Sequence, residues 1–141
     1  MTASEGYASL AEVRYQIRRF LHFSEGLARE HGLEPQQHQA LLVINSLPPH
    51  RKPTIREIAS RLFIEHNSAI GLISRLERLG AVKRFKSEED RREVLIRLTA
   101  TGEHLLASLS ETHEQELQVR APELIRALQR VLRSSNGVRS A

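Results

Sequence analysis

The sequence predicts a mainly α-helical protein with a small β-ribbon, an α+β fold of the winged helix-turn-helix class. Residues 82–86 alternate in side-chain character, and Val94, Ile96 and Leu98 recur at the period of two that gives a strand one buried face. Six consecutive polar or charged residues, 87–92, separate these strands. A two-stranded ribbon is marginally stable alone, so it must pack on the two short helices that residues 54–80 indicate.

The N-terminal part of the chain predicts two helices. Over residues 9–31, apolar side chains recur at spacings of three and four, charged residues occupy the other face, and the stripe ends before His31-Gly32. Glu34-Pro35 opens a second helix, because proline is tolerated in a first helical turn. Apolar residues cover much of its circumference, which predicts burial. The three prolines of residues 48–53 then indicate a loop.

Residues 54–79 carry the clearest helix signals. Thr54 and Glu57 match a capping box, in which the two side chains reciprocally satisfy free backbone N–H groups of a first turn. A second helix is predicted over residues 66–79. Its spacing gives a core face made of Ala69, Leu72, Ile73 and Leu76. The side chains expected to face outward are His66, Asn67, Ser68, Gly71 and Ser74.

Two helices are predicted after the ribbon. Thr99 is the expected N-cap of a long helix that reaches about residue 120, Ala121-Pro122 breaks the pattern, and a final helix ends near residue 133. Residues 134–141 are expected to form a flexible tail. The apolar stripes of residues 9–31 and 100–133 are too wide for one winged region, residues 35–99, to cover. We therefore predict that both segments are dimerisation helices.

Positive charge is concentrated in the predicted helix-turn-helix and ribbon. The 141 residues suit a single domain and carry a net charge of +4. From Arg51 to Arg97 there are 12 Lys or Arg against 7 Asp or Glu, an excess of +5, which leaves 9 against 10, or −1, elsewhere. This distribution favours a polyanion such as double-stranded DNA as the partner. The alternative is a winged helix used for protein–protein assembly without DNA binding, and the charge distribution argues against it.

Several classes of protein are excluded by what the sequence lacks. There is no cysteine, so a disulfide framework, a thiolate nucleophile and a cysteine-ligated zinc site are impossible. The seven histidines show no compact ligand spacing, and no nucleophile–base pair or phosphate-binding glycine loop is present. We therefore expect no metal, no cofactor and no enzyme activity. Without an early apolar run or a stretch of about 18 apolar residues, we expect a cytoplasmic protein with no signal peptide and no membrane span.

Three motifs together resemble the MarR family of bacterial transcriptional regulators. The motifs are Arg75-Leu76-Glu77 with Gly80, Asp90-Arg91-Arg92, and Leu98-Thr99 with Gly102. Their separations suit an order of six helices with a ribbon before the fifth. The resemblance covers about residues 10–132. It implies a homodimer in which helices one, five and six interlock and two winged domains read a palindromic operator. It also implies a repressor that a small aromatic or phenolic ligand releases.

The resemblance assigns DNA binding to the recognition helix and the ribbon. Arg92 matches the position whose guanidinium enters the minor groove, and Asp90 matches the position that orients it by a charge-assisted hydrogen bond. Where many members have threonine and arginine, this chain has Ile70-Gly71, so position 71 supplies no arginine to read guanine. The predicted DNA-binding residues are His66, Asn67, Ser68, Ile70, Gly71, Ser74, Lys83, Arg84, Lys86, Asp90, Arg91 and Arg92.

Each of these residues also has a structural alternative. Arg91 and Arg92 could simply solubilise a hairpin tip, and the basic residues of the first strand could contact only water. Asn67 and Ser68 could be first-turn capping residues. We expect Arg75, further along the same helix, to be a structural ion-pair partner rather than a base reader.

A small-ligand site is predicted between the dimerisation helices and the winged region, where family members commonly bind aromatic or phenolic compounds. The candidate residues on the first two helices are Phe20, His22, Phe23, His38 and Leu41. Phenylalanine at helical spacing is more often part of a core, and the two histidines are equally compatible with ordinary hydrogen-bonded positions.

Overall fold

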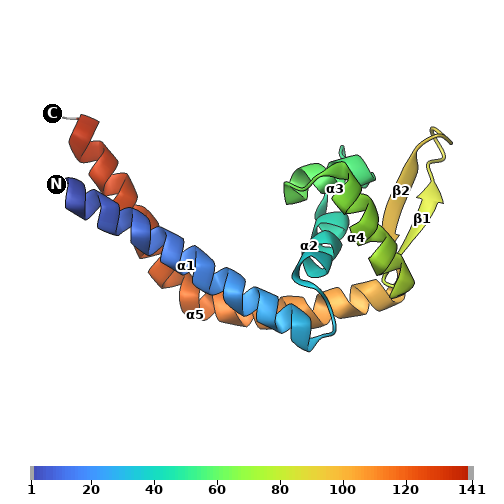
Figure 1. Ribbon diagram of the computed structural model, residues 1–141, viewed down its shortest axis with the longest axis horizontal. Coiled ribbons are helices and arrows are strands. Elements are labelled where there is room, and N and C mark those ends of the chain that lie inside the picture. The colour runs from blue at the N-terminus through green and yellow to red at the C-terminus, as the bar shows by residue number, and fades with distance from the viewer. Residues whose placement is uncertain (1, 140–141) are drawn as a thin grey trace. The chain divides into compact units, whose positions relative to one another are not determined.

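The computed structural model describes residues 2–139, with side chains through Arg133. Within that range the elements are α1 (Ala3–Glu30), α2 (Pro35–Ser46), α3 (Ile55–Leu62), α4 (His66–Arg78), β1 (Val82–Lys86), β2 (Val94–Leu98) and α5 (Ala100–Arg139) (Figure 1). This order confirms the predicted α+β class with a winged helix-turn-helix. The chain forms two compact units. The winged unit is Ala28–Ser110, and the described part of the helical unit is residues 2–27 and 111–139.

The core of the winged unit lies where α2, α3, α4 and the ribbon meet (Figure 1). The four residues predicted for the core face of α4 are all 0% exposed, which confirms that prediction. Burial of each large apolar side chain contributes about 1.5–3 kcal/mol. The other buried residues contributed by these elements are Ala40, Leu41, Ile44, Ile58, Ala59, Val82 and Ile96.

Helix α3 has Thr54 as its N-cap, through one half of the predicted capping box. The Thr54 hydroxyl accepts a hydrogen bond from the Glu57 backbone N–H at 3.1 Å. The reciprocal bond to the Glu57 carboxylate was predicted wrongly, because the Thr54 N–H donates to the Lys52 carbonyl at 2.8 Å. The Glu57 carboxylate instead pairs with Arg61 at 3.3 Å and with Arg51 at 3.7 Å.

The turn between α3 and α4 contains a residue in the left-handed region. Phe63 has φ 55° and ψ 42°, and its N–H donates to the Ser60 carbonyl at 3.3 Å. The Ile64 N–H donates to the Ala59 carbonyl at 3.1 Å, so the last carbonyls of α3 are satisfied. A β-carbon in this conformation costs roughly 1 kcal/mol. Burial of the Phe63 side chain, which is 96% exposed, offsets little of that cost.

The ribbon pairs β1 and β2 antiparallel, with Val82 opposite Leu98. Its inner face rests on Val82, 2% exposed, and Ile96, 0% exposed. Val94 was predicted to share this buried face but is 40% exposed, because it lies at the tip end of the ribbon. The Ile96 N–H donates to the Pro53 carbonyl at 2.9 Å, which ties the loop before α3 to β2.

Thr99 and Gly102 join the start of α5 to the turn after α4. The Thr99 hydroxyl accepts from the Gly102 N–H at 3.1 Å and donates to the Gly80 carbonyl. The Thr99 N–H donates to the Ala81 carbonyl at 3.0 Å. A β-carbon at Gly102 would lie 2.0 Å from the Ala81 carbonyl oxygen, so the close approach requires glycine. This contact is the physical reason for the Leu-Thr-x-x-Gly motif in the sequence.

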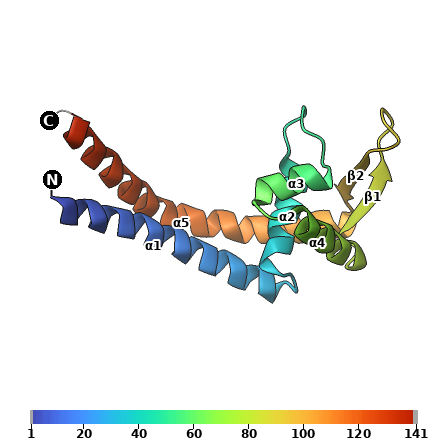
Figure 2. The ribbon, with the colours of Figure 1, turned by 45° about the horizontal axis from the view of Figure 1, so that its top comes forward.

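In the helical unit, α1 and α5 run antiparallel and side by side, as Figures 1 and 2 show from two directions. Helix α1 begins at Ala3, earlier than the predicted residue 9, because Thr2 and Glu5 form a reciprocal cap. The Glu5 N–H donates to the Thr2 hydroxyl at 3.2 Å, and the Thr2 N–H donates to the Glu5 carboxylate at 2.7 Å. Hydrogen bonds from the backbone and then the side chain of Thr2 lower the pKa of the Glu5 carboxyl.

Helix α5 continues through Pro122, so the predicted break at Ala121-Pro122 is wrong. A proline inside a helix costs about 3 kcal/mol, through a lost hydrogen bond and a clash with the preceding turn. Polar contacts with α1 lie next to the proline. The Glu123 carboxylate accepts from Arg19 Nη1 at 3.2 Å and from Gln16 Nε2 at 3.4 Å. One long helix therefore stands where two were predicted.

The predicted flexible tail, residues 134–141, has a helical backbone as far as Arg139, and its last two residues lie outside the described part. Its flexibility stays a prediction. Across residues 2–139, no helix combines the length and apolar character needed to cross a membrane.

Candidate nucleic-acid interface

The first turn of α4 presents three polar side chains to solvent. His66, Asn67 and Ser68 are all exposed. The N-cap is Glu65, whose carbonyl accepts from the Ala69 N–H at 3.0 Å, so neither Asn67 nor Ser68 occupies the capping position. Their side chains make no hydrogen bond with any residue that the structure describes. They are therefore available to an external partner.

The next turn of α4 combines an exposed apolar side chain with a glycine. Ile70 is 37% exposed, and a β-carbon at Gly71 would lie 3.3 Å from Arg75 Nη1. The Arg75 guanidinium therefore lies beside the place where a side chain at position 71 would begin. Arg75 Nε is 3.4 Å from Glu34 Oε2, a contact that is an ion pair without the geometry of a hydrogen bond. The predicted structural role of Arg75 as an ion-pair partner is confirmed.

Arg84 connects the ribbon to the recognition helix. Its Nη2 donates to the Ser74 hydroxyl at 3.2 Å, and its Nε lies 3.5 Å from Glu77 Oε2. Ser74 and Arg84 both belong to the predicted DNA-binding residues, yet in the free chain their polar atoms bind one another. The contact fixes β1 against α4, and a direct DNA contact by either residue stays a prediction.

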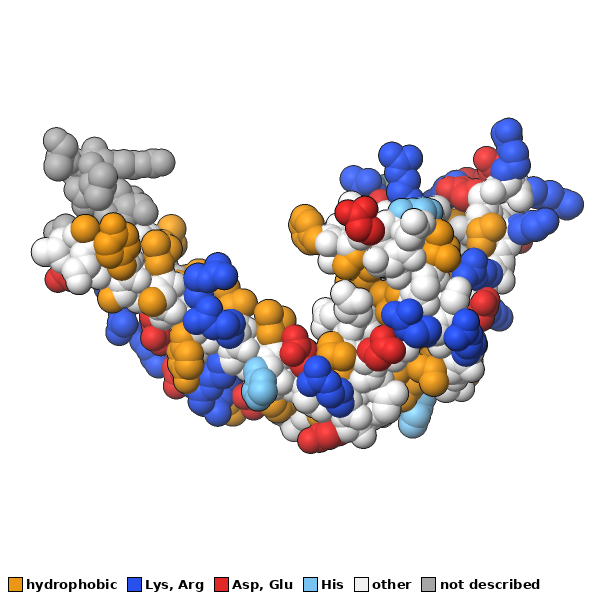
Figure 3. Space-filling view, in the orientation of Figure 1, with side chains coloured by type: hydrophobic (Ala, Val, Ile, Leu, Met, Phe, Trp, Pro, Cys, Tyr) orange, Lys and Arg blue, Asp and Glu red, His pale blue; other side chains and the backbone are white. Residues whose placement is uncertain are grey.

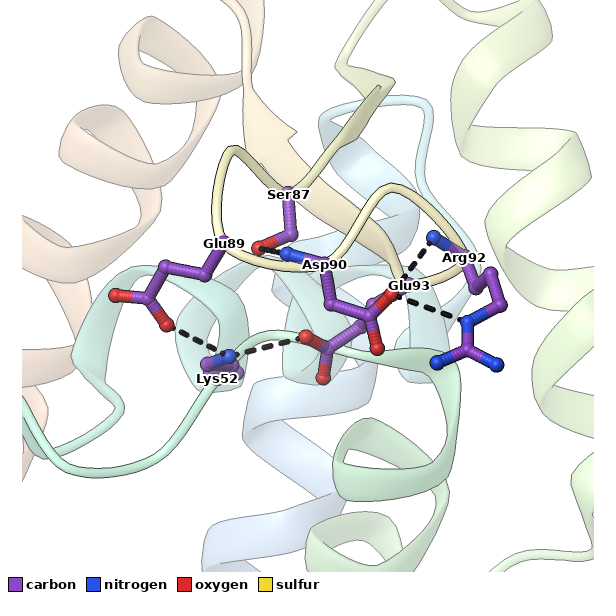
Figure 4. A network of polar contacts seen from close by, with 6 residues as sticks. All are labelled: Lys52, Ser87, Glu89, Asp90, Arg92 and Glu93. Carbon is purple, nitrogen blue, oxygen red and sulfur yellow. Dashed lines mark hydrogen bonds and ion pairs between the residues drawn. The ribbon is translucent and has the colours of Figure 1, made fainter.

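Backbone hydrogen bonds close the turn between β1 and β2. The Ser87 N–H donates to the Glu93 carbonyl at 3.0 Å, and the Glu93 N–H donates to the Asp90 carbonyl at 3.0 Å. Asp90 Oδ1 accepts from the Arg92 N–H at 3.0 Å and lies 3.4 Å from Arg92 Nε (Figure 4). The predicted bond between Asp90 and Arg92 is thus present in the free chain. The Arg92 side chain remains 94% exposed.

Basic side chains gather around the ribbon tip (Figure 3). The predicted residues Lys83, Lys86, Arg91 and Arg92 are all exposed. Their position on one projecting ribbon gives the winged unit a surface that suits a polyanion, because each cation can neutralise a phosphate.

Lys52 is a residue of this surface that sequence reasoning missed. Its Nζ lies 3.0 Å from Glu93 Oε2 and 3.2 Å from Glu89 Oε2, so it links the loop before α3 to the ribbon tip (Figure 4). The hydrogen bond with Glu93, and to a smaller extent that with Glu89, raises the pKa of Lys52 above its ordinary value. Lys52 and Glu93 are 41 residues apart in the chain, so no local pattern signals the pair.

Residues 31–93 match the model of the MarR family, and this range contains the recognition helix, β1 and the ribbon tip. Over these residues the chain is similar to the MarR family. The MarR match therefore covers nearly all of the surface described above. The matched range includes Ile70-Gly71 of the recognition helix.

Curated MarR-type relatives share part of their length with this chain. YfiV, an uncharacterized HTH-type transcriptional regulator of Bacillus subtilis (strain 168), is 34% identical over 82 residues, 58% of this chain and 49% of that protein. The HTH-type transcriptional regulator MgrA of Staphylococcus aureus is 26% identical over 107 residues, 76% of this chain and 69% of that protein. The chain spans about half the length of several of the curated relatives it matches.

Solved structures share the fold at low sequence identity. AbsC, a MarR family transcriptional regulator from Streptomyces coelicolor, has a TM-score of 0.72 at 20% identity, covering 100% of this chain and 98% of that one. A mutant of S. aureus MepR bound to an oligodeoxyribonucleotide has a TM-score of 0.66 at 19% identity, with coverages of 92% and 96%. CouR from Rhodococcus jostii RHA1, bound to p-coumaroyl-CoA, has a TM-score of 0.62 at 21% identity, with coverages of 70% and 68%.

Two of the three ligand residues predicted on α1, Phe20 and Phe23, lie in an aromatic cluster of the helical unit. Phe20 and Phe23 approach the His113 ring edge-on, with centroid distances of 6.1 Å and 5.9 Å. His113 is 9% exposed, and its Nε2 is 2.7 Å from the Ser24 hydroxyl oxygen. His22 is exposed. His113 did not figure among the predicted residues, because it lies on a helix distant in the sequence.

The predicted ligand residues of α2 are buried in the winged unit. His38 is 3% exposed and Leu41 is 0% exposed. Neither therefore presents its side chain to solvent. A MarR-type ligand site that uses residues of both units stays a prediction.

Proposed function

We propose that the protein is a sequence-specific, double-stranded DNA-binding transcriptional regulator that acts in the cytoplasm as a repressor. One observation carries the proposal: a single compact unit combines a helix with an unengaged polar first turn and a ribbon tip that projects a braced, exposed Arg92. In this proposal α4 reads base edges in the major groove and Arg92 enters the minor groove. The match of residues 31–93 to the MarR family model and the DNA-bound structure of MepR support it.

Selection of duplexes from a random pool by the purified protein, followed by a salt titration, tests this function. We expect one sequence to be enriched. We also expect the logarithm of the affinity to fall linearly with the logarithm of the salt concentration, because phosphate contacts release counterions. Failure to enrich any sequence, together with an absence of salt-dependent binding to duplex DNA, would favour a protein–protein assembly module instead.

We further propose a homodimer that reads a palindromic operator, with half-sites about one helical turn, roughly 34 Å, apart. Support comes from the helical unit, in which many large apolar side chains are exposed in the single chain, as they are at protein interfaces. The exposed apolar residues of α1 and α5 in this unit are Tyr7, Leu10, Tyr15, Ile17, Leu21, Leu117, Val119, Ile125, Leu128 and Leu132.

Leu128→Glu should convert the dimer into a monomer. Leu128 is 45% exposed in the single chain, and an unpaired charge at an apolar interface costs several kcal/mol. Gln129→Glu adds the same charge at the next exposed position, which is not apolar, and should leave the dimer intact. Sedimentation at micromolar concentration distinguishes the variants. A folded parent chain that sediments as a 16.1 kDa monomer would contradict the proposed dimer.

We also propose that a small aromatic or phenolic ligand lowers DNA affinity. The aromatic cluster of Phe20, Phe23 and His113 and the complex of CouR with p-coumaroyl-CoA support this proposal. A ligand changes DNA affinity only through its different affinities for the two conformations of the protein. Compounds that raise the melting temperature should therefore weaken operator binding. A set of stabilising compounds that all leave operator binding unchanged would count against the proposal.

A further inference from the structure

The ribbon tip is fastened to the body of the winged unit by one lysine. Lys52 stands at the end of the proline-containing loop before α3, and its Nζ contacts carboxylates on both sides of the tip, Glu89 at 3.2 Å and Glu93 at 3.0 Å (Figure 4). The Glu93 side chain is 28% exposed and that of Glu89 is 81% exposed. The contact with Glu93 is therefore the better shielded of the two.

Lys52 is itself attached to rigid structure. The Lys52 carbonyl accepts a hydrogen bond at 2.8 Å from the backbone N–H of Thr54, and Thr54 is the N-cap residue of α3. The carbonyl of the next residue, Pro53, accepts from the Ile96 N–H at 2.9 Å, and Ile96 is 0% exposed. The lysine thus extends from a backbone segment that is bonded both to α3 and to β2.

The two glutamates enclose the residues that are expected to contact DNA. Asp90 and Arg92, which bind each other, lie between Glu89 and Glu93 in the sequence, in a turn closed by the bond from the Ser87 N–H to the Glu93 carbonyl. Holding both glutamates therefore limits the directions in which the tip can point. A two-stranded ribbon has little stability of its own, so such an attachment determines how much freedom the tip retains.

We propose that Lys52 is a positioning residue for DNA binding, which acts through Glu93 and Glu89 to hold the Asp90–Arg92 pair in the orientation that enters the minor groove. The inference rests on the proposed DNA-binding function. Lys52 does this by restricting the ribbon tip before DNA arrives, so that less conformational entropy is lost on binding. Lysine is protonated throughout the neutral pH range at its ordinary pKa, so the attachment stays charged there.

Neutralising one acidic residue at a time separates positioning from simple electrostatics. Glu88 is exposed and makes no hydrogen bond or ion pair with another described residue, whereas Glu93 contacts Lys52. Glu88→Gln and Glu93→Gln raise the net charge equally at nearly the same place. If charge alone mattered, both variants would bind DNA more tightly, because each lowers the repulsion of phosphate.

We expect the two variants to change DNA affinity in opposite directions. On the duplex selected from the random pool, Glu88→Gln should bind more tightly than the parent, and Glu93→Gln should bind about two- to fivefold more weakly, the effect of losing a partly exposed ion pair. Lys52→Met should also weaken binding, and Lys52→Arg, which keeps the charge, should restore most of the affinity. In the free proteins, exchange of the Ser87 and Glu93 amide hydrogens should accelerate in Glu93→Gln and Lys52→Met but not in Glu88→Gln.

The outcomes distinguish this inference from the function on which it rests. A Glu93→Gln protein that binds as tightly as Glu88→Gln, with unchanged amide exchange at the tip, would overturn the positioning role and leave the DNA-binding function intact. A parent protein that binds no duplex would overturn both.

Discussion

A Gly102→Ala protein should unfold at a lower urea concentration than the parent, with a loss of about 1–3 kcal/mol in the free energy of unfolding. In an open helix the same substitution would stabilise by up to about 1 kcal/mol, because alanine has the higher helix propensity. At Gly102 the new methyl group would lie 2.0 Å from the Ala81 carbonyl oxygen. Backbone, rather than the end of a flexible side chain, would have to move. Urea denaturation followed by circular dichroism measures the effect.

Gly26→Ala provides the matched control. Gly26 is also inside a helix, but a β-carbon there would meet no atom within 4 Å. This variant should be as stable as the parent or more stable by up to about 1 kcal/mol. Equal stability of the parent and the Gly102→Ala protein would show that the close approach of Gly102 to Ala81 is relaxed in solution.

Arg92→Ala should weaken binding to the selected operator and to a scrambled duplex alike, and reduce the salt slope by about 1. The Arg92 side chain is 94% exposed and braced by Asp90, so its loss should remove the proposed minor-groove contact and leave the fold unchanged. Asp90→Ala should have a similar but smaller effect, because the unbraced arginine loses more entropy on insertion. Arg14→Ala removes the same charge from an exposed position on α1 and serves as the control.

Asn67→Ala and Ser68→Ala, unlike Arg92→Ala, should affect binding to the operator more than binding to the scrambled duplex. Each should cost on the order of 1–3 kcal/mol on the operator if it removes a base contact, with little change on the scrambled duplex. Binding measured on both duplexes at two salt concentrations separates the two classes of residue. An Arg92→Ala protein that binds both duplexes as well as the parent, with the same salt slope, would mean that the tip is a solvated turn.

The parts of the fold that the sequence predicted correctly depend on local patterns. The core face of α4 follows from helical spacing. The N-cap at Thr54 follows from a threonine that stands three positions before a glutamate. The break predicted at Pro122 is wrong, because α5 continues through the proline. Next to it Gln16 and Arg19 of α1 bind Glu123, and such contacts between distant segments leave no local signal. One helix, α5, therefore stands where two were expected.

The candidate site shows the same difference between local patterns and contacts of distant segments. The exposed first turn of α4 was predictable from helical spacing, and the pairing of Asp90 with Arg92 was predicted from the resemblance to the MarR family. The engagement of Arg84 with Ser74, across 10 residues, and of Lys52 with Glu93, across 41, depends on how separate elements pack. Residues proposed to contact DNA are thus easier to recognise in this sequence than residues proposed to position them.

The bond between Thr99 and Gly80 also bears on the order in which the winged unit folds. The two residues are 19 positions apart, and β1, the tip and β2 all lie between them. Because the entropy lost in closing a loop grows only with the logarithm of its length, a loop of this size is inexpensive to close. Closing this bond therefore brings the ribbon and the first turn of α5 together at once. Because a two-stranded ribbon has little stability alone, we expect this step to coincide with packing of the ribbon on α3 and α4.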